Sequence, residues 1–102
     1  MPTTNFLIEY AQRFLNSDNP GNRVELQIEF RKRLIVEGVS VEDAHIAAKE
    51  FHYAFLQKDE IEMKRYLDNT QDICNKYDKP RRVIEEYAKY LERLKQQSKP
   101  KL

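Results

Sequence analysis

The chain has 102 residues, of which 34% are charged and 40% hydrophobic, and this balance excludes both a disordered chain and a large multidomain protein. It has two glycines, no tryptophan and many Glu, Lys, Gln, Arg, Leu and Ala residues, which lose least on entering a helix, so an all-α fold is expected. No apolar run approaches the roughly 20 residues that span a bilayer, so no membrane association is expected. The single cysteine suits a cytoplasmic location.

Apolar spacing predicts one compact bundle domain over residues 1–97, followed by a disordered basic tail at 98–102. The bundle should contain four to five helices, with these approximate bounds: 4–17, 22–37, 41–57, 59–77 and 80–97.

The first helix, 4–17, has apolar side chains at helical spacing, and Thr3, Thr4 or Asn5 can cap its start. It should end before the sequence "NSDNPGN", which contains the common turn residues. Pro20 in this stretch is expected to belong to the loop.

The second element, 22–37, carries two competing patterns. Four apolar residues alternate with polar ones, as in a half-buried strand: Val24, Leu26, Ile28 and Phe30. The same side chains also fall on one wide arc of a helix. A helix is favoured because Asn22 and Glu25 form an N-cap pair and because a lone strand would have no partner.

Gly38, Val39 and Ser40 separate two helical runs, a pattern found in DNA-binding helix-turn-helix motifs. Charge argues against DNA, because residues 37–62 hold seven acids and two bases, a net charge of −5. Gly38 is instead expected to end one helix in a left-handed conformation, after which Val39 packs back and Ser40 caps the next helix. Asp43 then stands at the capping-box position.

The stretch from Ser40 to Lys79 has neither glycine nor proline, yet its apolar stripe shifts by roughly a quarter turn. The shift falls at "QKDEIE", where Asp59 and Glu62 have N-cap and N3 spacing. Two helices, 41–57 and 59–77, are therefore favoured, with one long kinked helix as the competing geometry.

Residues 80–97 form the clearest predicted helix, since Asp78 can cap it and Pro80 suits its first turn. From residue 76 onward nine Lys or Arg oppose four Asp or Glu, a net charge of +5. Nucleic-acid binding is therefore the alternative function, through a basic set on this helix: Arg81, Arg82, Lys89, Arg93 and Lys95. These positions scatter around the helix, which makes nucleic acid the less favoured partner.

No catalytic site, metal site or cofactor is predicted, so the protein is not expected to be an enzyme. The three serines fall in cap, loop or tail positions, and the two glycines are isolated. Glu42 and His45 form one Glu-x-x-His step, but a di-iron bundle needs a second. His45 and His52 are expected at the surface or its rim, and Cys74 as a buried apolar residue.

A protein-binding surface is the functional feature that the sequence favours. Ile46 and Tyr53 project opposite the main apolar face of helix 41–57, so either this helix is central or the two side chains anchor a partner. Gln27 and Arg31 interrupt the apolar arc of the preceding helix and are further candidates. We expect a small non-catalytic interaction module, such as an adaptor, inhibitor, immunity-type or assembly factor, with homodimerisation as an additional hypothesis.

Overall fold

Five helices and no strand make up the part of the chain that the computed structural model describes, which is residues 5–98 for the backbone and 5–94 for side chains. The helices are α1 (Phe6–Asn16), α2 (Pro20–Val36), α3 (Val41–Ala54), α4 (Glu60–Cys74) and α5 (Asp78–Ser98). The predicted all-α bundle is confirmed. The expected basic tail at 98–102 falls, apart from Ser98 at the end of α5, outside the described residues.

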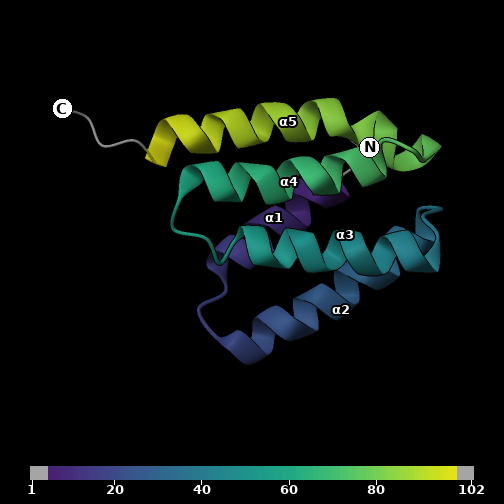
Figure 1. The fold of residues 1–102 in the computed structure, drawn as a ribbon, viewed down its shortest axis with the longest axis horizontal. Coiled ribbons are helices and arrows are strands. Elements are labelled where there is room, and N and C mark those ends of the chain that lie inside the picture. The colour runs from purple at the N-terminus through teal and green to yellow at the C-terminus, as the bar shows by residue number, and fades with distance from the viewer. Residues whose placement is uncertain (1–4, 99–102) are drawn as a thin grey trace.

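Four of the helices lie side by side in one layer, in the order α2, α3, α4, α5, and α1 crosses behind them (Figure 1). Helix α3 packs against both α2 and α4, while α5 lies along the far side of α4. The central position predicted as one option for α3 is therefore observed. None of the described helices is long and apolar enough to cross a bilayer.

One aromatic cluster joins the helices into a single core. The ring of Phe51, on α3, has its centroid 4.4 Å from that of Phe30 on α2 and 5.6 Å from that of Phe14 on α1. Tyr87 of α5 lies 6.1 Å from the same ring. Helix α3 reaches its neighbours closely because four of its buried side chains are alanines: Ala44, Ala47, Ala48 and Ala54.

The strand-like alternation at the start of α2 belongs to a helix. Leu26, Phe30 and Leu34 are buried at i, i+4 and i+8, whereas Val24 and Ile28 are 51% and 42% exposed. A strand would have placed all the apolar members of the alternation on one covered face. The period of two therefore reflects two separate apolar sides of one helix.

The predicted start of this helix at Asn22 was wrong by two residues. Helix α2 begins at Pro20, and the Oδ1 atom of Asn19 accepts a hydrogen bond of 2.8 Å from the Gly21 amide. Proline is well suited to the first helical position, since its missing N–H would have no partner there and its φ is already helical. Pro20 therefore starts a helix here instead of lengthening the loop.

Helices α3 and α4 are separate, as favoured over one kinked helix. The chain leaves the helix after Ala54, and Asp59 caps α4 by accepting a hydrogen bond of 2.9 Å from the Ile61 amide. Both helices end three residues before the predicted ends at 57 and 77. The prediction was too long because apolar residues continue at helix-like spacing into the turn that follows each helix.

At the junction between α2 and α3, Gly38 ends one helix and Ser40 caps the next, as the sequence predicted. Gly38 has a φ of 101°, and the Val39 amide donates to the Leu34 carbonyl at 2.9 Å. Ser40 Oγ accepts from the Asp43 amide at 3.2 Å. The hydroxyl of Tyr77, from the turn before α5, donates to the Asp43 carboxylate, so the cap of α3 is also tied to the distant end of α4.

Substitution of Gly38 should test the left-handed position. We expect Gly38→Ala to lower the free energy of unfolding by about 1–2 kcal/mol, because a side chain is strained at positive φ although nothing lies within 4 Å of the new Cβ. Gly38→Asn, which tolerates this conformation better, should cost less in the same urea titration. Equal losses for both variants would contradict the conformational explanation.

The Tyr87 hydroxyl offers a second test of the core. It is buried without a hydrogen-bond partner among the described residues, and burial raises its pKa well above the usual value for tyrosine. We expect Tyr87→Phe to raise the free energy of unfolding by roughly 1 kcal/mol, since it removes an unpaired buried hydroxyl. Tyr77→Phe, which removes the hydrogen-bond partner of Asp43, should instead lower the free energy of unfolding. Thermal denaturation of the two variants beside the wild type would measure both changes.

Candidate functional site

Ile46 and Tyr53 lie on the side of α3 that the described part of the chain leaves partly open. Helix α3 is enclosed by α2 and α4 on its flanks and contacts α1 at its back through the ring pair Phe51 and Phe14. Ile46 is nevertheless 47% exposed and Tyr53 38% exposed. Helix α3 is therefore central and still presents two large apolar side chains to solvent, and a role of these side chains in anchoring a partner stays a prediction.

The Tyr53 ring is held in place by its neighbours. It packs edge-on against Tyr66 of α4, with 6.2 Å between the ring centroids. The Lys49 Nζ atom lies 5.9 Å from the centroid of the Tyr53 ring. The side-chain amide of Gln57 donates to the Tyr53 carbonyl oxygen at 3.0 Å, which fixes the backbone at the end of α3. A tyrosine fixed in this way loses little side-chain entropy when a partner covers it.

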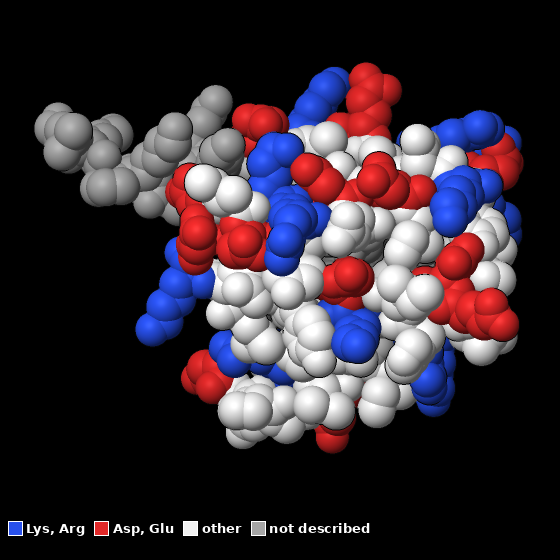
Figure 2. All heavy atoms as spheres, viewed as in Figure 1, with Lys and Arg blue, Asp and Glu red and all other residues white. Residues whose placement is uncertain are grey.

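Helix α2 adds a second apolar row beside this pair. Val24, Ile28 and Ile35 fall within about 40° of one another around the helix axis, and all three are exposed. We call these three residues together with Ile46 and Tyr53 the α2–α3 face. Figure 2 shows this side of the molecule, where uncharged side chains predominate in the lower half, over α3 and α2.

Gln27 has an internal partner, which the sequence did not reveal. Its Oε1 atom lies 2.6 Å from Nδ1 of His52, and an amide oxygen can only accept, so the imidazole donates. His52 is 7% exposed and stacks on Phe14 at 5.5 Å, so the prediction of a surface or rim histidine was wrong for this residue. The imidazole fills the α1–α2–α3 junction because Gln27 satisfies its polar edge.

Arg31 is half-buried and follows Gln27 by one helical turn on α2. Its position around the axis lies between Gln27 and the exposed apolar row, at the edge of the α2–α3 face. It therefore stays a candidate contact for a partner, whereas Gln27 is better explained by its hydrogen bond to His52.

Three of the basic residues on the described part of α5 lie beside acids. Asp78 accepts from Arg81 and Arg82, each at 3.1 Å, and Lys89 lies 3.9 Å from Glu85. These acids reduce the positive potential that a phosphate backbone requires. Arg93 is exposed, and the side chain of Lys95 lies outside the described residues.

Catalytic and metal-binding chemistry finds little support in the described residues. Cys74 is fully buried, and burial raises the pKa of its thiol to about 12, so the nucleophilic thiolate is scarce at neutral pH. No three His, Cys, Asp or Glu side chains among the described residues gather where they could hold a metal ion. Glu42 and His45 start α3 without a facing set of ligands.

Comparisons of the chain with protein-family models, with curated proteins and with solved structures find no match.

The His52 environment predicts a pH-dependent stability. Burial, and then the positive charge of Arg23, lower the pKa of His52 below its usual 6.5. The unfolded chain therefore takes up a proton more readily than the folded one, and stability should fall as pH drops below 6.5, by at most about 1.4 kcal/mol per pH unit.

Urea titrations between pH 7 and 5 would measure this dependence. The His52→Gln variant should lose this contribution to the fall of the unfolding free energy with pH. His45→Gln, which changes an exposed histidine on the same helix, should keep it. An unchanged slope in His52→Gln would show that other groups cause the loss.

Proposed function

We propose that this protein is a small non-catalytic protein–protein interaction module that binds a second copy of itself through the α2–α3 face. The observation that carries the proposal is the exposure of Ile46 and Tyr53 on a helix whose other three sides are enclosed by the chain. Apolar side chains gathered across two helices are more often an interface than isolated exposed residues are.

The composition of the face is suited to binding. Tyrosine and arginine are enriched among the residues that dominate interface energies. Tyr53 belongs to the α2–α3 face, and Arg31 lies at its edge. Tyr53 is 38% exposed on the open side of α3, so a partner surface that covers it could also contact the exposed apolar residues of α2. The net charge of +1 gives little repulsion between two copies.

Charges beside Ile46 and Tyr53 favour self-association over an unrelated partner. Lys49 and Glu50 lie on opposite flanks of the line that joins Ile46 to Tyr53, about 50° to either side. A two-fold axis parallel to α3 would place Lys49 of each copy beside Glu50 of the other. The same axis would bring Ile46 against Ile46 and Tyr53 against Tyr53, so the surface complements itself.

Analytical ultracentrifugation over a concentration series would test the proposal. We expect the wild-type protein to form dimers, and Ile46→Asp and Tyr53→Asp each to raise the dissociation constant at least about tenfold, because a carboxylate would be buried at the two-fold axis. Circular dichroism should show unchanged helicity, since both side chains point to solvent.

Ile61→Asp is the matched control. It changes another isoleucine, 77% exposed, at the first turn of α4, where an acid is favourable. Dimerisation should survive it. A wild-type protein that stays monomeric at high concentration and low salt would refute self-association, and a dimer insensitive to Ile46→Asp and Tyr53→Asp would refute this face.

A further inference from the structure

A second apolar surface lies on the opposite edge of the bundle, between α4 and α5. These two helices run antiparallel in the layer, and the groove between them encloses about 410 Å³ (Figure 1). Its apolar lining comes from three helices: Leu15, Met63, Leu67, Ala88, Leu91 and Leu94. Four of these residues belong to the apolar stripes of their own helices, so the sequence pattern did not distinguish them from ordinary core positions: Met63, Leu67, Leu91 and Leu94.

The apolar lining of the groove combines small and flexible side chains. Ala88 is the smallest of the apolar residues that line it, and Leu15, at the end of α1, is 46% exposed and borders the same space. Met63 contributes a flexible thioether, a side chain that adapts to differently shaped apolar partners. The groove can therefore accept side chains of another molecule without rearrangement of the helices.

The rim of the groove is acidic. Glu60, Asp68 and Glu92 line it together with one base, Lys64, so the described charges sum to three negative and one positive, a net of −2. Lys64 Nζ is held 2.9 Å from Asp68 Oδ2, which neutralises that pair. Glu60 and Glu92 remain on the two sides of the groove, and they favour a partner whose apolar surface is flanked by positive charge.

The walls of the groove select a helical partner. An extended peptide laid over leucine side chains would leave its own N–H and C=O groups unpaired, since α4 and α5 use theirs internally. A helix satisfies its backbone groups and presents side chains at i, i+3 and i+4. The lining from Glu60 to Gln71 spans about 16 Å of α4, which corresponds to about three helical turns.

We infer that the α4–α5 groove binds an amphipathic helix of a partner protein, with an apolar face that fills the groove and Lys or Arg residues along its edges. This site is separate from the α2–α3 face and does not depend on self-association. The two surfaces together would let one small protein join a second copy of itself to a different protein.

Two synthetic amphipathic peptides of about four helical turns would test the inference. Both have the same leucine face, but one has lysines along its edges and the other has glutamates. Fluorescence anisotropy should show binding of the lysine peptide only, and ¹H–¹⁵N spectra should place the shifts at Met63, Leu67 and Leu91. Equal binding of both peptides, or shifts elsewhere, would overturn the inference.

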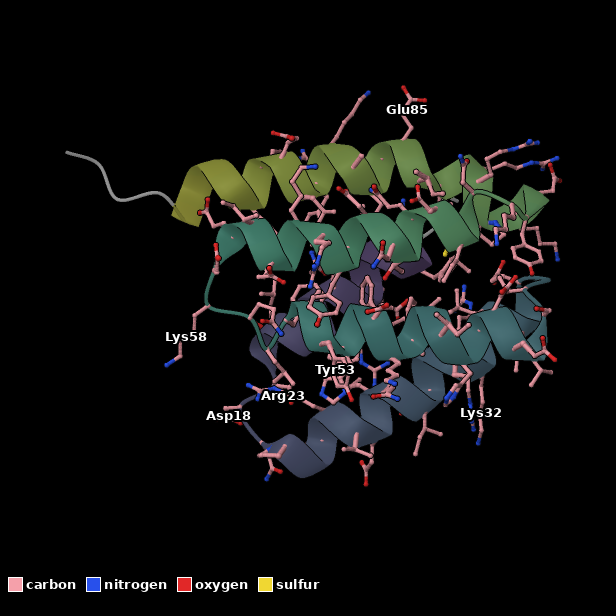
Figure 3. All side chains as sticks on the ribbon, viewed as in Figure 1. Asp18, Arg23, Lys32, Tyr53, Lys58 and Glu85 are labelled. Atoms are coloured by element: carbon pink, nitrogen blue, oxygen red, sulfur yellow. The ribbon has the colours of Figure 1, made fainter. Side chains whose placement is uncertain are left out.

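Two groove variants and a control separate groove binding from general charge attraction. Glu92→Lys should weaken the lysine peptide roughly tenfold, and Ala88→Phe should block it by filling the groove. Glu85→Lys makes the same charge change on the outer side of α5, where Glu85 points away from the bundle (Figure 3), and should have little effect. Equal weakening by Glu92→Lys and Glu85→Lys would overturn the site.

The Ile46→Asp variant completes the design. It should bind the lysine peptide as the wild type does, because Ile46 lies on the other surface. Loss of dimerisation with retained peptide binding would therefore support two independent surfaces. Loss of peptide binding in this variant would contradict an independent groove.

Discussion

The contact of the Phe51 ring with Phe30, Phe14 and Tyr87 is the interaction on which the bundle depends. These rings belong to four of the five helices, so one set of contacts joins most of the bundle. An aromatic group packs over a larger area than an aliphatic one, and ring pairs add directional attraction. The core is therefore small, and it fixes α3 at the centre while the outer helices are each buried on one side only.

Two surfaces with different properties follow from that arrangement. Because the cluster draws α1 behind the layer, the front of α3 stays open and exposes Ile46 and Tyr53. On the other edge of the layer, α5 lies along α4, and the groove between them is lined by Ala88 and its apolar neighbours.

The sequence predicted much of this fold because helix ends are local features. Ser40 and Asp59 cap helices at the expected positions, and Gly38 has the expected left-handed φ, since each depends on a few neighbouring residues. The Gln27–His52 contact joins residues 25 apart, and the groove at Ala88 is built from three helices, so neither is visible in local periodicity. Ile46 and Tyr53 could be identified because a second apolar edge on one helix is itself periodic.

The burial of Cys74 has a practical consequence for study of the two surfaces. The only native thiol of the chain is enclosed in the core with its pKa raised to about 12, so reagents that attack thiolates should leave it unmodified in the folded protein. A cysteine introduced on the exposed side of α2 or α5 would then be the single reactive thiol. Spin labels or fluorophores could be attached there without first removing the native residue, and the core would keep its natural packing.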